Sequence, residues 1–227
     1  MNDKAIRIFP LGDTALTVEF GNAISPELNR RAIALADRIE SNPFPGFVET
    51  VPAYAATTIF YDLLEVRRSF SEYATAFDAV ETFVRKRIED LAASPDIEAR
   101  LVEIPVTFDR ESEFDLGCIA EQHGLSVDEV IEIFQSKTYR VYMLGFLPGF
   151  SYMGEVDERI ATPRKQTPRT LVPKGSIGIA GRQTGIYSLA SPGGWQIIGR
   201  TEIEMFTPNG VYPTYLQAGD EVRFVSV

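Results

Sequence analysis

The stretch from Gly145 to Phe206 constrains the fold of this chain more than any other feature. It holds ten of the chain's 17 glycines and five of its 14 prolines. Glycine and proline at this density interrupt helices and force sharp turns in the backbone. Between the turns lie short segments rich in β-branched and aromatic residues, at 139–144, 176–180, 186–189, 195–198, 202–206 and 221–225. Many short strands separated by such turns predict a barrel or a sandwich for the second half of the chain.

The first half of the chain shows a different pattern, in which helices alternate with strands. Strands are expected at 6–9, 15–20, 47–51, 57–61 and 101–108, and helices at 26–39 and 71–93. Ser25 has the features of an N-cap, with Pro26 at the first helical position. From Ala15 the order is β-α-β-β-α-β, which is typical of ferredoxin-like folds. We therefore predict an α+β protein with a ferredoxin-like α/β domain at residues 1–95 and a β-barrel domain at 96–227.

A helical connector is expected at about 113–136, at the start of the barrel domain. Ser126 and Glu129 have the spacing of a capping box and open a helix at 127–135. The helix before it holds the single cysteine, Cys118, and ends at the single histidine, His123. We expect Cys118 to be a buried packing residue and His123 to cap the negative end of its helix. One cysteine excludes an internal disulfide, and one histidine argues against zinc or iron, so no metal site is expected.

The overall charge argues against several classes of partner. The chain has 32 acidic and 22 basic residues, and its net charge of −10 disfavours binding to nucleic acid. Its N-terminus lacks the apolar segment of a signal peptide, and no stretch reaches the roughly 18 apolar residues of a membrane span. We therefore expect no nucleic-acid partner, no membrane association and a cytoplasmic location.

Positive charge is concentrated in one window of this acidic chain. The segment from Arg159 to Thr201 contains no Asp or Glu, and its seven basic residues are Arg159, Arg164, Lys165, Arg169, Lys174, Arg182 and Arg200. A cationic surface shaped by glycine turns suits an anion such as a carboxylate or a phosphate. The alternative is a solvated loop face whose acidic partners come from elsewhere in the fold. The residues alone leave both interpretations open.

Four motifs in the glycine-rich stretch offer candidate binding residues. The run PKGSIGIAGRQTG at 173–185 is neither a P-loop nor a dinucleotide fingerprint, and its glycines let the backbone approach a ligand or a packed neighbour. The run SPGGWQIIGR holds the only tryptophan, Trp195, which is either a core residue or a pocket wall. The run ATPRKQTPRT presents Arg164 and Arg169 outward, where each can bind a carboxylate or a phosphate. The aromatic run GFLPGFSYMG packs inside the barrel or forms an interface.

These motifs resemble those of a known family. GFLPGFSYMG, ATPRKQTPRTLVPKGSIGIAGRQTGIY and SPGGWQIIGRTEIEMFTP, together with PLGDTALTVEFG near the start, are similar to the B subunit of 5-oxoprolinase. The family includes the first subunit of allophanate hydrolase-like proteins and a bacterial sporulation kinase inhibitor. The resemblance runs from about Phe9 to Phe224. It implies an N-terminal α/β domain joined to a cyclophilin-like β-barrel, of the type found in the carboxyltransferase part of urea carboxylase.

The resemblance also implies a function and partners. It implies the B subunit of an ATP-dependent 5-oxoprolinase, which opens 5-oxo-L-proline to L-glutamate together with an A subunit and with a C subunit, whose barrel is related. ATP, with Mg²⁺, is then bound by the complex, and no cofactor is intrinsic to this chain. One alternative is a binding module that inhibits a sensor histidine kinase. Another is a component of an allophanate hydrolase or urea-carboxylase-type enzyme.

Phosphoryl chemistry needs cations around developing charge. The candidate catalytic residues are therefore Arg164, Arg169, Lys174 and Arg182. The candidate substrate-binding residues are Gly181, Gln183, Thr184, Tyr187, Ser191 and Trp195. The chain departs from the family at Phe134 in the connector helix, where family members often have a histidine.

Overall fold

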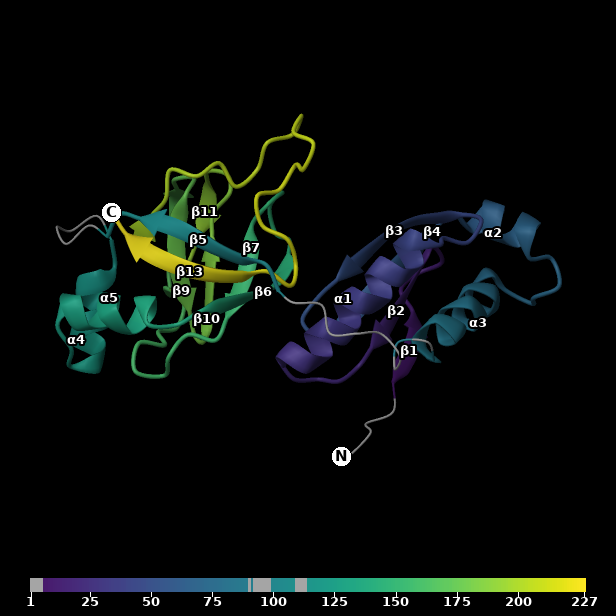
Figure 1. Ribbon diagram of the computed structural model, residues 1–227, viewed down its shortest axis with the longest axis horizontal. Coiled ribbons are helices and arrows are strands. Elements are labelled where there is room, and N and C mark those ends of the chain that lie inside the picture. The colour runs from purple at the N-terminus through teal and green to yellow at the C-terminus, as the bar shows by residue number, and fades with distance from the viewer. Residues whose placement is uncertain (1–5, 90, 92–98, 109–113) are drawn as a thin grey trace. The chain divides into compact units, whose positions relative to one another are not determined.

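The structure is a computed structural model that describes residues 6–89, 91, 99–108 and 114–227 (Figure 1). The chain forms two compact units, Met1–Glu98 and Ala99–Val227. Each unit has a hydrophobic core of its own.

The first unit is an antiparallel sheet packed against helices. Its strand order is β1-β2-β4-β3. The strands are β1 (Arg7–Pro10), β2 (Ala15–Glu19), β3 (Phe47–Pro52) and β4 (Ala56–Tyr61), and the helices are α1 (Pro26–Ser41), α2 (Leu63–Ser69) and α3 (Ala76–Glu89). The apolar stripes of α1 and α3, which include Leu35 and Val80, join the sheet residues Leu16 and Ile59 in one core. The 3.6-residue spacing of these apolar positions explains why both segments are helices.

The helix boundaries follow local capping signals. The Ser25 side chain accepts a hydrogen bond from the N–H of Leu28, which confirms the predicted N-cap of α1. The helix expected at 71–93 is shorter, since α3 begins at Ala76. There the N–H of Asp78 donates to Thr75 Oγ1 at 3.0 Å, and the N–H of Thr75 donates to Asp78 Oδ2 at 2.9 Å. The short helix α2 was not predicted, and the expected end at 90–93 lies largely outside the described residues.

The ferredoxin-like arrangement expected for the first unit is not confirmed. A ferredoxin-like fold needs one more strand in the first sheet, and the sequence pattern predicted that residues 101–108 form it. In the structure this strand, β5 (Leu101–Val106), belongs to the second unit, where it pairs in parallel with β13 (Glu221–Ser226). The first sheet therefore keeps only four strands within the part of the chain that the structure describes.

The second unit is built on a seven-stranded sheet that curls into a nearly closed barrel (Figure 1). The strand order is β12-β9-β10-β7-β6-β13-β5. The remaining strands of this sheet are β6 (Tyr139–Leu144), β7 (Ser151–Gly154), β9 (Ser176–Ala180), β10 (Gln183–Ile186) and β12 (Gln196–Arg200). Two reciprocal backbone hydrogen bonds between Thr107 and Arg200 link its two edges. The strand expected at 202–206 does not form, since only Phe206 makes an isolated bridge, to Thr214.

A smaller sheet and two helices complete the second unit. The small sheet pairs β8 (Arg169–Val172) with β11 (Ser191–Gly193). The helices α4 (Leu116–His123) and α5 (Val127–Gln135) pack on each other and against β12 and β13 (Figure 1). The predicted capping box that opens α5 is confirmed.

The connector helices correct the expectation for Cys118, and they show the contacts that His123 and Phe134 make. Cys118 is exposed rather than buried, because the buried stripe of α4 runs through Leu116 and Ile119. The αL residue Gly124 caps α4 at its C-terminus, and the His123 ring lies 3.1 Å from Thr162 Oγ1. Phe134 is fully buried and stacks on Phe224 with ring centroids 5.0 Å apart, so it serves the core.

The described helices also bear on membrane insertion. None of them combines the length and the apolar character that crossing a bilayer requires.

Candidate functional site

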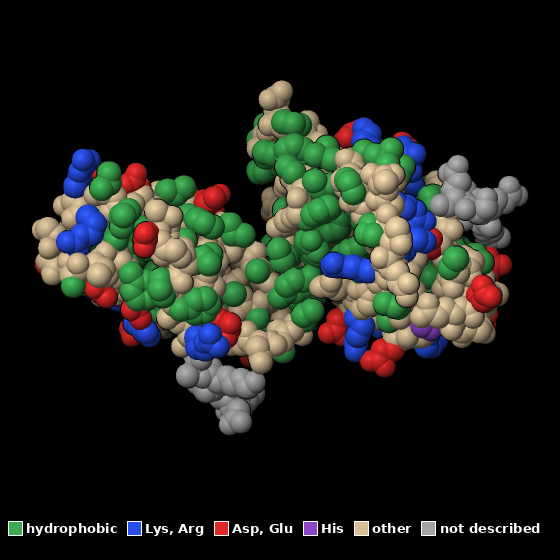
Figure 2. Space-filling model, turned by 180° about the vertical axis from the view of Figure 1, so that it is seen from behind, with side chains coloured by type: hydrophobic (Ala, Val, Ile, Leu, Met, Phe, Trp, Pro, Cys, Tyr) green, Lys and Arg blue, Asp and Glu red, His purple; other side chains and the backbone are tan. Residues whose placement is uncertain are grey.

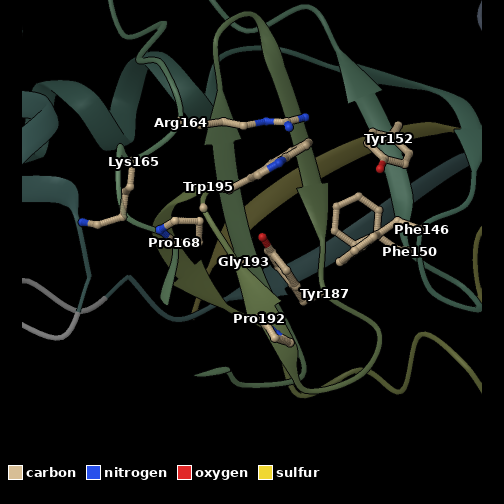
Figure 3. A pocket seen from close by; sticks show the side chains of 11 residues that line it. Phe146, Phe150, Tyr152, Arg164, Lys165, Pro168, Tyr187, Pro192, Gly193 and Trp195 are labelled. Carbon is tan, nitrogen blue, oxygen red and sulfur yellow. The ribbon is translucent and has the colours of Figure 1, made fainter. Parts of the chain in front are cut away.

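A pocket of about 290 Å³ opens on the second unit, beside the small sheet (Figure 3). It lies among the loop between β6 and β7, the segment 163–168 before β8, and the turn between β11 and β12. Its lining residues are Phe146, Phe150, Tyr152, Arg164, Lys165, Pro168, Tyr187, Pro192, Gly193, Gly194 and Trp195. The volume is close to the lower limit of about 300 Å³ for small-molecule sites, so the pocket suits a small ligand.

Aromatic rings form one wall of the pocket. The Phe150 ring lies edge-on to Trp195 at 5.5 Å and to Tyr187 at 5.1 Å between centroids. Tyr152 lies 4.8 Å from Phe150 and 5.9 Å from Trp195. Phe146 closes the rim with 61% of its surface exposed, and its φ of 64° shows that the loop holds it in the left-handed region. Edge-to-face packing of this kind is favourable and fixes the shape of the wall.

Two tyrosines of this wall stay neutral near pH 7. Burial raises the pKa of Tyr187 above its ordinary value, and a hydrogen bond with the backbone of Trp195 offsets only part of this effect. Burial also raises the pKa of Tyr152, with a smaller opposing effect from the positive charge of Arg164. Neutral phenols can donate hydrogen bonds to a carbonyl or carboxylate oxygen.

Arg164 supplies positive charge at the mouth of the pocket. Its guanidinium carbon lies 5.9 Å from the centroid of the Trp195 ring, and Figure 3 shows the two side chains side by side. Within the described residues, no carboxylate lies at ion-pair distance from Arg164, whereas Lys165 and Arg169 both pair with Asp115. An arginine fork held over an aromatic ring and free of an ion pair is suited to an anionic group of a ligand.

Asp115 connects the segments that carry the pocket. Its Oδ1 accepts hydrogen bonds from Lys165 Nζ at 2.7 Å and from Arg169 Nη2 at 2.8 Å. Its Oδ2 accepts a third, from the N–H of Ile197 at 2.7 Å. Burial by itself raises the pKa of Asp115, but the hydrogen bonds from Arg169, Lys165 and Ile197 outweigh it, so the pKa lies below its ordinary value. Asp115 is therefore ionised throughout the physiological pH range.

The structure brings together some of the predicted site residues. Arg164, Tyr187 and Trp195 line the pocket. Trp195 is only 5% exposed and packs in a hydrophobic cluster with Phe150 and Tyr187, so it is both a core residue and part of the pocket wall. Arg169 and Ser191 lie in the adjoining small sheet, on β8 and β11. Ser191 is buried, and its hydroxyl donates to the carbonyl oxygen of Pro192 at 3.2 Å.

Other predicted residues lie elsewhere on the second unit. Lys174 pairs with Glu204 beside a much smaller hollow of about 10 Å³. Arg182 pairs with Glu155 and Glu158 before the start of β10, whereas Tyr187 follows the end of that strand. Of the four candidate cations, Arg164 lines the pocket and Arg169 adjoins it, whereas Lys174 and Arg182 do not line it. Figure 2 shows acidic side chains beside basic ones on the face of the unit that carries the purple side chain.

The predicted glycine and polar positions around Arg182 have structural contacts. Gly181 adopts a positive φ of 61°, and its N–H bonds to the carbonyl oxygen of Thr162 at 2.7 Å. Thr184 is fully buried, and its hydroxyl donates to the carbonyl oxygen of Gly178. Gln183 begins β10 opposite Gly154. None of these three lines the pocket, and a part for them, for Lys174 or for Arg182 in a reaction stays a prediction.

Sequence reasoning missed several pocket residues. Phe146, Phe150 and Tyr152 belong to the aromatic motif, but the motif alone left open whether it packs inside the barrel. Lys165 belongs to the basic window without being singled out. Asp115 gave no local signal, because its partners lie 50 to 82 positions away along the chain.

Comparisons with known proteins place this geometry in a family. The family model of the carboxyltransferase domain, subdomain C and D, matches residues 6–216. The chain is 44% identical over 222 residues to the 5-oxoprolinase B subunit of Bacillus subtilis (strain 168), a match that covers 97% of this chain and 92% of that protein.

Solved structures agree with the fold. The crystal structure of TTHA0988 is similar at a TM-score of 0.79 and 37% identity, over 98% of this chain but only 40% of that one. Kluyveromyces lactis urea amidolyase is similar at a TM-score of 0.75 over the whole of this chain and 15% of its own, and at 20% identity this shows the fold alone. The motifs, the fold and the near full-length identity agree, and the chain belongs to the family of 5-oxoprolinase B subunits, within the carboxyltransferase subdomain C and D group.

Proposed function

We propose that this protein is the B subunit of an ATP-dependent 5-oxoprolinase and that its pocket binds the 5-oxoproline ring. Support from the family comes from the name of the Bacillus subtilis relative, which is the B subunit of 5-oxoprolinase. That name implies further subunits, and we propose that they are the A and C subunits of the same enzyme.

The observation that carries the proposal is the position of Arg164 over Trp195 in an aromatic pocket. 5-Oxoproline is a five-membered lactam with a carboxylate on one ring carbon. The guanidinium fork of Arg164 suits the carboxylate, and the rings of Trp195 and Phe150 suit the apolar face of the lactam. The hydroxyl of Tyr187 is placed to donate to a ligand oxygen, because the backbone of Trp195 already serves its acceptor side.

Opening the lactam adds water across a stable amide bond, and ATP supplies the driving force. Phosphorylation of the amide oxygen would make the ring carbon more electrophilic. Water would then add to that carbon, the C–N bond would break with a proton going to the nitrogen, and hydrolysis of the remaining acyl phosphate would release phosphate and the new carboxylate. Within the described residues, no three His, Cys, Asp or Glu side chains gather in a way that could hold a metal ion. We propose that ATP, with Mg²⁺, is bound by the assembled complex, and we derive no step through them in this chain.

Reconstitution with the two partner subunits tests the proposal. Release of glutamate that depends on both ATP and 5-oxoproline is the expected activity. Replacing Arg164 by Ala removes a charge-assisted hydrogen bond worth about 1.5–3 kcal/mol, so KM for 5-oxoproline should rise about 10- to 150-fold. Arg223→Ala is the control, since Arg223 is a half-exposed arginine on β13 of the same unit and does not line the pocket.

Two results would count against the proposal. If the assembled complex shows no 5-oxoproline-dependent turnover, the assigned reaction is wrong. If Arg164→Ala assembles normally and its KM for 5-oxoproline is unchanged, the substrate carboxylate does not bind in this pocket.

A further inference from the structure

We propose that Asp115 is a positioning residue of the pocket, which sets the place of Arg164 through Lys165 and Arg169. The inference rests on the proposed function only in naming 5-oxoproline as the ligand. The positional part concerns the chain alone and can be tested without a substrate.

The segment that carries Arg164 has little structure of its own. Residues 163–168 form neither helix nor strand, and they run from the bridge between Thr162 and Gly181 to the start of β8. Two hydrogen bonds tie this segment to the β11–β12 turn and to the first residue of β12. The N–H of Lys165 donates to the carbonyl oxygen of Gly194 at 2.7 Å, and Gln196 Nε2 donates to the carbonyl oxygen of Pro163 at 3.0 Å.

Asp115 binds two charged side chains of this region, one within the segment and one at its end. Lys165 follows Arg164 directly, and Arg169 begins β8 at the end of the segment. Both side chains bond to the same carboxylate oxygen of Asp115. Charge-assisted hydrogen bonds are about twice as strong as neutral ones, so these two contacts outweigh the backbone ties.

Asp115 is itself fixed to the strand that follows Trp195. Its N–H donates to the carbonyl oxygen of Ile197 at 2.6 Å, and its Oδ2 accepts from the N–H of Ile197. Only 4% of its surface is exposed. The Asp115 carboxylate therefore links Arg169 and Lys165, the neighbour of Arg164, to β12, the strand that follows Trp195. This geometry fits the role of a residue that holds a binding group without touching the ligand.

Asp115 also leaves Arg164 available for a ligand. The carboxylate is shared by two cations, so the cluster of Asp115, Lys165 and Arg169 carries net positive charge beside the pocket. Within the described residues, Arg164 has no carboxylate of its own. A ligand carboxylate would pair with Arg164 and offset part of this positive charge.

The test variant is Asp115→Asn. The asparagine oxygen can still accept from the N–H of Ile197, but its NH₂ group then faces Lys165 and Arg169 and cannot accept from them. Asp220→Asn is a matched control, because Asp220 is 5% exposed, pairs with Arg100 and accepts from the N–H of Gln217. Asp220 does not line the pocket.

The first measurement uses the only tryptophan of the chain, Trp195. Acrylamide is uncharged, so its quenching of Trp195 fluorescence reports access rather than charge. We expect the quenching constant of Asp115→Asn to rise about twofold as the segment opens locally, and that of Asp220→Asn to stay at the wild-type value. An unchanged constant in Asp115→Asn, or an equal rise in both variants, would overturn the positional role.

The second measurement uses the reconstituted complex. We expect Asp115→Asn to raise KM for 5-oxoproline about tenfold and to leave kcat within about twofold of wild type, because a displaced binding group weakens binding before it affects chemistry. Lys165→Met provides a milder variant in case Asp115→Asn does not fold, since the Lys165 side chain is 30% exposed. A wild-type KM in Lys165→Met would overturn the route through Lys165. If Arg164→Ala leaves KM of the complex unchanged, 5-oxoproline is not the ligand of this pocket. The fluorescence result would still decide whether Asp115 positions the segment.

Discussion

Gly193 lies where the pocket wall leaves no room for a side chain. An added Cβ would lie 2.3 Å from Tyr187 Oη and 2.9 Å from Cε1 and Cζ of the same ring. Tyr187 is 1% exposed, and Phe150 packs edge-on against its ring. The tyrosine can therefore yield only towards the pocket that it lines, and this movement disturbs its packing on Phe150.

The expected cost of Gly193→Ala follows from these contacts. Overpacking a tightly packed site costs about 1–3 kcal/mol. Displacing Tyr187 also breaks its hydrogen bond with the backbone of Trp195, worth about 1 kcal/mol. Replacing glycine by alanine restricts the unfolded chain and returns about 0.4–1 kcal/mol. The net destabilisation is therefore about 1–3 kcal/mol, which lowers the urea midpoint by about 1 M for an m-value of about 2 kcal/mol/M.

The neighbouring glycine gives a matched control. A Cβ at Gly194 would meet its nearest atoms at 3.7 Å, which is ordinary van der Waals contact. Urea unfolding followed by Trp195 fluorescence should leave Gly194→Ala at or slightly above wild-type stability and lower only Gly193→Ala. Equal stability of the two variants would refute the reasoning from packing.

Two further predictions concern Asp115 and Tyr139. Because the folded pKa of Asp115 lies below its unfolded value of about 3.9, its ion pairs add stability above that value and lose it as the pH falls through the folded pKa. The difference in urea midpoint between wild type and Asp115→Asn should stay constant from pH 7 to 5 and shrink below pH 4, whereas a constant difference would contradict the assignment. Tyr139 is fully buried and donates to the carbonyl oxygen of Phe134 at 2.8 Å, so Tyr139→Phe should cost about 1–3 kcal/mol by thermal unfolding. Tyr212→Phe, at a side chain with 74% exposure, should cost nothing measurable, and an equal loss in both would contradict the burial argument.

Local signals in the sequence predicted the elements that depend on local physics. The N-cap at Ser25 and the capping box at Ser126 appear as expected, because each involves residues three positions apart. The strand β5 shows the limit of such signals. Its apolar pattern predicts a strand in either unit, and only the long-range pairing with β13 decides which sheet it joins.

The same limit explains what could be predicted of the candidate site. Glycine turns and a lone tryptophan indicated the region, and Arg164, Tyr187 and Trp195 do meet there. Uniform positive charge along the sequence did not predict a uniform surface, because Glu155 and Glu158 lie just outside the basic window and pair with Arg182. Asp115 could not be predicted from the sequence, because only the folded barrel brings its three partners together.

A crystal structure of the assembled complex with 5-oxoproline tests the central claim most directly. The account predicts the lactam in the pocket beside Trp195, with its carboxylate at hydrogen-bond distance from the guanidinium of Arg164. Density for the ligand in one of the partner subunits, with this pocket holding only solvent, would contradict it.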